Sequence, residues 1–411
     1  MLRKVAITGR GLLTAAGSEL YSVWQSLFDG TCFIAPLQRF SCTNMADLWG
    51  GEVSTPLCDL STDNDKQVID HIAAYGRCTK LALIATKLAL TEAQLINDTK
   101  RRAPIGVIIG TTMGEEESVG ELNDHFTQIG YDAVDATFYQ RADNHHITTN
   151  ISRYFSLTGP SILCTAACSS GNAAIALAYD MIASGRAELM VAGGADTLTR
   201  TVYSGFSRLG ILAKSVCRPF DLNRDGVCFG EGAGILVLED YEHARTRGAN
   251  IIAEIAGYGM SNDAYHVTAP EPQGDGFTRA MRKALQQSNT SFSAIEYISA
   301  HGTGTIHNDN AETSAIKNIF GEHAYKLSIS SLKSMLGHCN GAASAIAAII
   351  CTLALQHQAV PPTANLTTHD PKCDLDYVPI HGRNLPLNNC LNLSAGFGGF
   401  NVCLIIKRCE T

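Results

Sequence analysis

The segment Ser161–Gly171 (SILCTAACSSG) places a cysteine between an expected strand and an expected helix. Small residues precede Cys168 and would let a substrate come close to the backbone, and the helix is expected over Gly171–Ser184. A thiolate near a helix N-terminus is stabilised by free N–H groups and by the helix dipole. The N–H group of the same residue can also bind an oxyanion. Cys168 is therefore a candidate nucleophile, and a buried structural cysteine is the alternative.

Two histidines follow two later strands of the expected sheet. His301 lies in AHGTGT, directly after the expected strand Glu296–Ala300, and His338 ends SLKSMLGH, which begins at the end of the expected strand Leu327–Ser331. Side chains just beyond the strands of an open α/β sheet lie at its carboxyl edge, where such folds bind ligands. The glycines of the first motif allow close approach, and its two threonines offer hydroxyls to a polar, linear ligand. A hydrogen-bonded loop histidine is the alternative for each.

Lys333 lies in the second of these motifs, beside an apolar helix, and Glu312 follows His301. Because a buried lysine needs a counter-charge, we expect Glu312 to be its partner; a surface salt bridge of little energetic weight is the alternative. The loop SAGFGGFN (394–401) joins two expected strands, and its N–H groups could bind a carbonyl oxygen while an aromatic side chain gates a pocket. Together, a cysteine, two histidines, a lysine and an amide-rich loop fit acyl transfer through a thioester.

Composition narrows the class of protein. The chain has 411 residues, of which 45% are hydrophobic and 17% charged, and its net charge is −8. Disorder and a coiled coil are excluded, and nucleic acid or an anionic membrane is an improbable main partner. The 14 cysteines show no CxxC pairing, so no metal site is predicted. The apolar run Gly341–Leu355 is too short to span a bilayer and is expected to form a buried helix, and no signal peptide is predicted before the expected strand Val5–Gly9.

Apolar strands alternate with helical segments along the whole chain, which predicts an α/β protein with a mainly parallel sheet covered on both faces. The second part of the chain repeats the style of the first, without a long linker between them. The expected strands lie at 5–9, 105–110, 161–165, 189–193, 234–239, 251–257, 296–300, 327–331, 391–393 and 402–407, and the expected helices at 79–95, 171–184, 275–287, 310–320 and 341–356.

With these motifs in order, the sequence resembles an elongating β-ketoacyl-[acyl carrier protein] synthase of the thiolase-like superfamily. The resemblance runs from VAITGRG to LIIKR and includes TAACSSG, AHGTGT, SLKSMLGHCNGAA, GFGGFN, RPFDLNRDGVCFGEGAG, SNDAYHVTAP, VPPTANL and CDLDYVP. It implies a thiolase-like α/β fold with two similar βαβαβ halves in a five-layer αβαβα arrangement. Residues 1–250 would contain the nucleophile, and residues 251–411 the catalytic histidines.

The resemblance also implies roles for matching positions. Cys168 would accept the acyl chain, His301 and His338 would promote decarboxylation of malonyl carrier protein, and Lys333, held by Glu312, would order the site electrostatically. The remaining implied residues are Cys168, Phe397, Gly398 and Gly399 for the oxyanion hole and gate, Thr303 and Thr305 for the pantetheine arm, Met113, Phe229, Phe397 and Phe400 for the acyl pocket, and Lys66, Arg208 and Lys214 for carrier-protein docking.

The implied reaction is a decarboxylative Claisen condensation that gives β-ketoacyl-[acyl carrier protein] and CO2 in polyketide or fatty-acid elongation. Phe400, which stands where fatty-acid enzymes usually have Thr, and the segment Asn308–Tyr325 are more similar to ketosynthase subunits of type II polyketide synthases, including aryl-polyene systems. The resemblance implies acyl carrier protein as partner, a homodimer or a heterodimer with a chain-length-factor-like subunit, and a cytoplasmic location. No metal or separate cofactor, nucleic acid or membrane span is expected, since substrates arrive on the phosphopantetheine arm.

Four other functions are alternatives to this reaction. A non-catalytic chain-length or scaffold partner is disfavoured because Cys168 and both histidines are present. A housekeeping fatty-acid elongation enzyme remains an alternative. A cysteine hydrolase would not need the second histidine or Lys333, and a non-decarboxylating thiolase normally has a second cysteine as base, which the GFGG loop does not offer.

Overall fold

The computed structural model of the chain describes residues 2–42, 48–54, 57, 75–96, 103–130 and 137–409. The strands of the main sheet are β1 (Val5–Thr14), β4 (Ile105–Gly110), β5 (Ser161–Cys164), β6 (Leu189–Asp196), β8 (Gly232–Asp240), β9 (Ala253–Asn262), β10 (Tyr297–Ser299), β11 (Ser328–Ser330), β14 (Asn389–Gly396) and β15 (Phe400–Lys407). The short strands are β2 (Ala35–Pro36), β3 (Trp49–Gly51), β7 (Phe229–Gly230), β12 (Ala359–Val360) and β13 (Arg383–Asn384). The helices are α1 (Leu20–Phe28), α3 (Arg77–Glu92), α4 (Glu116–Ile129), α5 (Thr137–Ala142), α6 (His146–Tyr154), α7 (Ser170–Ala183), α8 (Arg200–Arg208), α9 (Tyr241–Thr246), α10 (Asp275–Gln287), α11 (Ile306–Phe320), α12 (Lys333–Leu336) and α13 (Ala343–His357).

The main sheet is mixed, so the prediction of a mainly parallel sheet is wrong. Its strand order is β11-β10-β14-β15-β9-β1-β8-β6-β4-β5. Only the pairs at the two ends are parallel, and every pair from β14–β15 to β6–β8 is antiparallel. β14 and β15 are antiparallel because only a short loop joins them. A short loop permits a hairpin, whereas parallel strands need a long crossover connection.

The two ends of this sheet repeat one topology. Read from the edge inward, the first half has the order β5-β4-β6-β8-β1, and the second half has the order β11-β10-β14-β15-β9. The strands at matching places in the two halves also occur in the same order along the chain. The halves meet where β1 pairs with β9, over the short stretch in which Val5–Ile7 faces Ala253–Ile255. Each half is therefore one copy of the same arrangement, as the resemblance implied.

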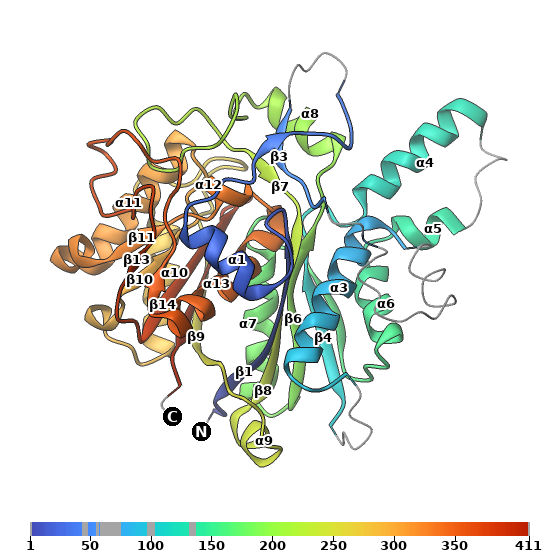
Figure 1. Cartoon of the computed structure of the whole chain (residues 1–411), viewed down its shortest axis with the longest axis horizontal. Coiled ribbons are helices and arrows are strands. Elements are labelled where there is room, and N and C mark those ends of the chain that lie inside the picture. The colour runs from blue at the N-terminus through green and yellow to red at the C-terminus, as the bar shows by residue number, and fades with distance from the viewer. Residues whose placement is uncertain are drawn as a thin grey trace.

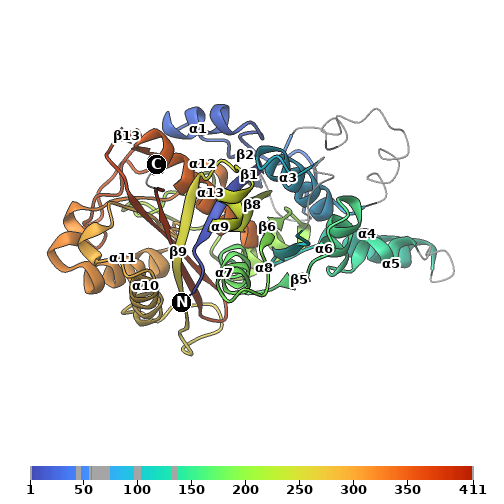
Figure 2. The same ribbon diagram turned by 90° about the horizontal axis from the view of Figure 1, so that it is seen from below.

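Five layers result from these two halves (Figures 1 and 2). α3 and α6 cover the outer face of the first half, and α10 and α11 cover the outer face of the second. α7 and α13 lie between the halves and pack against both. Residues alternate accordingly along β8, where Leu236 and Leu238 face the central helices while Ile235 and Val237 face α3. This period of two is what a strand buried on both faces requires.

The central helix α13 explains the apolar run noted in the sequence. The segment Asn340–His357 is long and apolar enough to cross a membrane, so the expectation that this run is too short is wrong, but 83% of the segment is buried inside the fold. It packs with α7 between the two halves of the sheet. The segment is therefore the core helix that the sequence predicted.

Candidate active site

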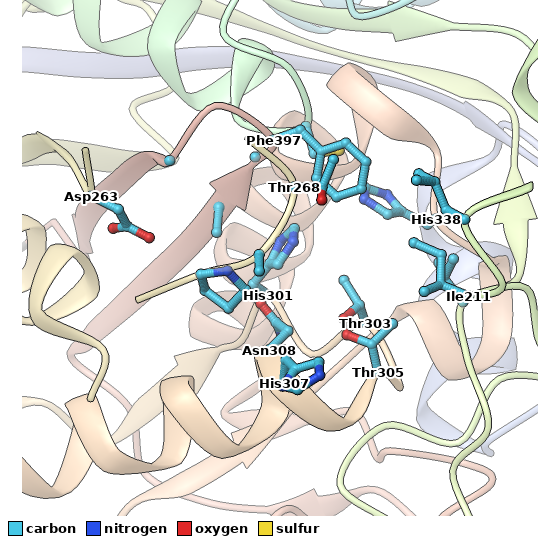
Figure 3. A pocket seen from close by; sticks show the side chains of 18 of the residues that line it. Ile211, Asp263, Thr268, His301, Thr303, Thr305, His307, Asn308, His338 and Phe397 are labelled. Atoms are coloured by element: carbon cyan, nitrogen blue, oxygen red, sulfur yellow. Dashed lines mark hydrogen bonds between the residues drawn. The ribbon is translucent and has the colours of Figure 1, made fainter. Parts of the chain in front are cut away.

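The residues singled out in the sequence converge on one pocket between the two halves of the fold. Cys168 follows β5, His301 follows β10, His338 follows β11 and Phe397 follows β14. All four line one pocket of about 200 Å³, together with Thr303. Figure 3 shows the two imidazoles and the Phe397 ring around this common cavity. Parallel pairing aligns the ends of β10, β11 and β14 at one edge of the second half. β5 belongs to the first half, so the packing of the two halves against each other, and not the strand order alone, brings Cys168 to the same pocket.

A tight turn presents the cysteine. Ala167 has a positive φ of 48°, which is rare for a residue with a side chain. The N–H of Ser169 donates to the Ala166 carbonyl at 3.1 Å, and that of Ser170 donates to the Ala167 carbonyl at 3.0 Å. α7 begins at Ser170, with Ser169 as its N-cap residue. Cys168 thus stands just before the helix, at its positive end.

Burial dominates the acidity of this thiol. Cys168 is 9% exposed, and burial raises the pKa of its thiol to about 12, while the Lys333 charge and the N–H groups of Cys168 and Phe397 lower it. Burial therefore outweighs the stabilisation that the sequence led us to expect from the helix N-terminus. The helix end and the amides act in the predicted direction, but they do not offset the loss of solvent around a thiolate. The thiol is protonated at neutral pH.

The two histidines are neutral as well. Their rings lie 5.5 Å apart at 83° to one another. Burial, and then the nearby positive charge of Lys333, lowers the pKa of His301 and of His338 well below its usual range. The Phe229 ring stacks on His338 at 5.9 Å. A neutral imidazole presents one N–H donor without a net charge, which suits hydrogen bonding to a developing oxyanion.

Lys333 and Glu312 meet at the His301 backbone rather than with each other. The Glu312 carboxylate accepts the N–H groups of His301 at 2.6 Å and Gly302 at 2.8 Å. The Lys333 ammonium group donates to the His301 carbonyl oxygen. Among the described residues no ion pair joins Lys333 to Glu312, so the predicted direct contact is corrected; their charges still attract each other over a longer distance. Burial raises the pKa of Glu312 to about 7.

The amide donors of the glycine-rich loop are fewer than expected. The Gly398 N–H donates to the Val267 carbonyl at 2.7 Å, and the Gly399 N–H donates to the Gly396 carbonyl at 3.1 Å. Neither can point at a substrate oxygen in this conformation, so the prediction that they belong to an oxyanion hole is corrected. The amides of Cys168 and Phe397 are the two that act on the Cys168 sulfur.

Phe206 is a pocket residue that the sequence analysis did not single out. The Phe206 ring, in α8, stacks on Phe397 at 5.2 Å and 15°. Nothing in the amphipathic pattern of α8 indicated a pocket residue. The hydroxyls of Thr303 and Thr305 lie 2.8 Å apart at the opposite wall. The other lining residues are Leu209, Ile211, Val227, Asp263, Thr268, Ala269, Pro270, His307, Asn308, Ala395, Gly396, Gly399 and Asn401.

Comparisons with known proteins decide the family. Residues 2–244 match the family "Beta-ketoacyl synthase, N-terminal domain", and residues 252–367 match "Beta-ketoacyl synthase, C-terminal domain". The chain is 39% identical to Nodulation protein E of Rhizobium meliloti (strain 1021), over 99% of this chain and 100% of that one. It is 37% identical to 3-oxoacyl-[acyl-carrier-protein] synthase 2 of Synechocystis, over 99% and 98% of the two chains.

The chain belongs to the β-ketoacyl synthase family. It is a condensing acyltransferase of fatty-acid or polyketide elongation. Similar solved structures include the ishigamide ketosynthase/chain length factor, with a TM-score of 0.93 and 35% identity over the whole of both chains. The type II polyketide ketosynthase of the AntDE:AntF complex has a TM-score of 0.89 and 32% identity, again over the whole of both chains.

The predicted acyl-pocket residues of this β-ketoacyl synthase are only partly placed as expected. Phe400 is 39% exposed and does not line the pocket, so that prediction is corrected. Its position at the start of β15 turns it outward, since successive residues of a strand point to opposite faces. Met113 and Phe229 do not line the pocket either, but they pack in an apolar cluster with Phe206 and Val227, directly behind its wall.

The predicted docking residues of the synthase lie at the surface where the structure describes them. Arg208 ends α8 and Lys214 follows it, and both are exposed. Between them, Leu209 and Ile211 line the pocket, which places both basic residues close to its mouth along the chain. Lys66 lies outside the described residues. Within the described part of the chain, no three His, Cys, Asp or Glu side chains are grouped as metal ligands.

Proposed function

We propose that this β-ketoacyl synthase extends an acyl chain held on Cys168 with two carbons from malonyl-[acyl carrier protein]. One observation supports the proposal above all others. A buried thiol, two neutral imidazoles and two backbone amides that act on the thiol sulfur line the same pocket. This set of groups can serve two successive thioester reactions without a strong base.

In the first step the Cys168 sulfur attacks the carbonyl carbon of the acyl carrier protein thioester. The carbonyl oxygen becomes an oxyanion between the N–H groups of Cys168 and Phe397. Because burial raises the pKa of the thiol to about 12, its proton leaves as the new bond forms. The oxyanion then collapses, the acyl group stays on Cys168, and the carrier protein leaves as a thiol that takes up the proton.

In the second step a malonyl thioester occupies the same pocket. Its carboxylate leaves as CO2, and the electron pair of the broken bond forms an enolate. His301 and His338, both neutral, donate their ring N–H groups to the enolate oxygen, where losing one such donor typically costs about 100- to 1,000-fold in rate. The enolate carbon attacks the acyl carbonyl carbon and β-ketoacyl carrier protein forms. Cys168 leaves as a thiolate, which takes up one proton from water.

Lys333 and Glu312 act on this site through the His301 backbone. The carboxylate accepts two N–H groups and the ammonium group binds the carbonyl of the same residue, so both hold the imidazole in place. Burial, and then the Lys333 charge, lowers the pKa of both imidazoles and keeps them neutral. Thr303 and Thr305 would bind the amide groups of a phosphopantetheine arm, and we expect no separate cofactor or metal.

We further propose how the synthase is organised. Residues 1–250 form the half with the nucleophile and residues 251–411 the half with the histidines. Carrier protein would approach the pocket mouth near Arg208 and Lys214 in the cytoplasm. Similar structures of a ketosynthase with its chain length factor, such as ApeO with ApeC from Xenorhabdus doucetiae (TM-score 0.85, 27% identity over 99% of this chain and 98% of that one), support the heterodimer over the homodimer.

Mass spectrometry tests the proposal. The purified chain is incubated with acyl and malonyl carrier proteins, with Cys168→Ala as control, and intact protein and peptides are weighed. An acyl adduct on Cys168 followed by β-ketoacyl carrier protein is the expected result. Release of free acid without extension would indicate a hydrolase. Product formation by Cys168→Ala in the assembled system would indicate a scaffold role.

A further inference from the structure

Two buried asparagines join the helix that follows the nucleophile to the strand that precedes Phe397. Asn172 is the third residue of α7, and Asn392 lies in the middle of β14; both are fully buried. The Asn392 Nδ2 group donates to Asn172 Oδ1 at 2.9 Å, and the Asn172 Nδ2 group donates to Ser394 Oγ at 3.1 Å. We call Asn172 and Asn392 the asparagine pair. Hydrogen bonding of this kind is what makes buried amide groups tolerable.

The pair acts on a contact that is already tight. β14 ends at Gly396, one residue before Phe397. A Cβ added to Gly396 would lie 3.0 Å from the Cys168 nitrogen and 3.0 Å from the Ala166 oxygen, so the strand end presses on the turn that presents the cysteine. Asn172 stands four residues beyond Cys168 on the other side. The register between α7 and β14 therefore sets the separation of the Cys168 and Phe397 amides.

A third element keeps the pair from sliding. Ser344, in the first turn of α13, accepts the Asn392 Nδ2 group with its carbonyl at 2.8 Å and the Asn172 backbone N–H with its hydroxyl at 2.9 Å. The surrounding layer is otherwise apolar, and apolar contacts tolerate small shifts that directional hydrogen bonds do not. Asn392 Oδ1 is buried without a hydrogen-bond partner among the described residues, a cost that an apolar pair would avoid.

The second histidine is fixed by other contacts. The His338 N–H donates to the Cys228 carbonyl at 2.7 Å, and its carbonyl accepts the Gly230 N–H at 3.1 Å. His301 is held by Glu312 and Lys333, as described above. None of these bonds includes the asparagine pair. The pair therefore bears on the two amides rather than on the two imidazoles.

From this we propose that Asn172 and Asn392 are positioning residues for acyl transfer to Cys168. They touch no substrate. They hold the N–H groups of Cys168 and Phe397 at the spacing that one thioester oxygen needs, whereas decarboxylation of the malonyl group depends on the histidines. The inference rests on the proposed function and divides its two steps between two parts of the structure.

The experiment measures the two steps separately in Asn172→Ala, Asn392→Ala and the double variant. Acyl transfer is followed as the single-turnover rate of Cys168 acylation by acyl carrier protein, and decarboxylation as acetyl carrier protein formed from malonyl carrier protein alone. We expect acylation to fall about 10- to 100-fold, since misplacing a reacting group by about 1 Å costs up to about 100-fold. Decarboxylation should stay within about twofold, and the double variant should resemble the single ones.

Two further variants control for a loss of stability. Ser394→Ala removes the acceptor of the Asn172 amide with little change in volume, and it decides the matter if the asparagine variants do not fold. Thr352→Val removes an equally buried hydroxyl of α13, one that contacts Arg10 and the Ile349 carbonyl instead. Any effect of this control should lower both rates in proportion.

The outcomes are distinguishable. If the asparagine variants lose acylation of Cys168 and keep decarboxylation, the inference is supported. Both rates lowered in proportion, or neither changed, overturns it while the proposed function stands, provided that the unmodified protein performs both steps. An unmodified protein that never acylates Cys168 overturns the proposed function and this inference together.

Discussion

The two halves of the molecule share one strand order but differ in the loop that follows the edge strand. After β5 the chain makes a turn of five residues, and α7 begins at Ser170. After β11, its counterpart, twelve residues intervene before α13, and they include α12 with Lys333 and His338, which forms a β-bridge with Phe229. The short connection brings a nucleophile and its own amide to the pocket. The longer one brings a cation and an imidazole, so the same scaffold supplies complementary groups from its two copies.

This difference divides the chemistry between the halves, and the most severe test removes the nucleophile. Cys168→Ala should abolish the acyl adduct and the condensation product, because no other thiol lines the pocket as described. Decarboxylation of malonyl carrier protein should continue, since both histidines remain. The measurement is the pair of rates defined above, and loss of both would contradict the division.

The reciprocal change belongs to the second half. His338→Ala should lower decarboxylation and condensation by about 100- to 1,000-fold, because the enolate loses a hydrogen-bond donor. Acylation of Cys168 should change by less than about tenfold, since its oxyanion is bound by backbone amides. Single-turnover mass spectrometry with acyl carrier protein checks this. Equal losses in both steps would mean that His338 serves the first half as well.

The pH dependence of alkylation tests the burial of the nucleophile. Because the pKa of the Cys168 thiol is raised to about 12, its thiolate fraction at lower pH should rise about tenfold per pH unit, or about 100-fold between pH 7 and pH 9. The rate of alkylation by iodoacetamide, read as the adduct on the Cys168 peptide, should therefore show no plateau in this range. An exposed cysteine in the unfolded chain is the control and should level off near pH 9. A plateau below pH 9 in the folded protein would show that the helix end and the amides outweigh burial.

The smallest effect on condensation is expected at Phe400, the first residue of β15. Phe400→Ala should change condensation by less than about twofold, because the ring is half-exposed and outside the pocket. Phe206→Ala is the matched comparison and should lower it about tenfold, since the Phe206 ring supports Phe397. Steady-state rates with one acyl carrier protein suffice. A larger effect at Phe400 than at Phe206 would restore the sequence-based assignment.

The sequence predicted the location of the site better than its hydrogen bonds. Each of Cys168, His301 and His338 follows a strand, as the local apolar patterns predicted, and the packing of the two halves then brings the three residues into one pocket. Hydrogen-bond partners follow from distances of a few ångströms that no spacing specifies. The sequence therefore led to the wrong partner for Glu312, which accepts the His301 N–H group rather than the Lys333 ammonium group. It also placed the Gly398 N–H group in the oxyanion hole, although this group donates to the Val267 carbonyl.

The misjudged residues have the same origin. Phe206 contributes to the pocket only because α8 folds back over the sheet edge, which is a tertiary contact without a sequence motif. Phe400 was misplaced because a residue at the first position of a strand can face either side. The antiparallel centre of the sheet was missed because apolar runs of β14 and β15 look alike in either direction.

The central layer has a consequence for how the chain folds. The cluster around α7 and α13 is bounded on one side by β1, β4, β6 and β8 and on the other by β9, β10, β14 and β15. Each half isolated from the other would leave one face of its sheet and of its long apolar helix in water. The chain should therefore unfold in a single cooperative transition, and a nick between β8 and β9 should yield two fragments that become native only when they recombine.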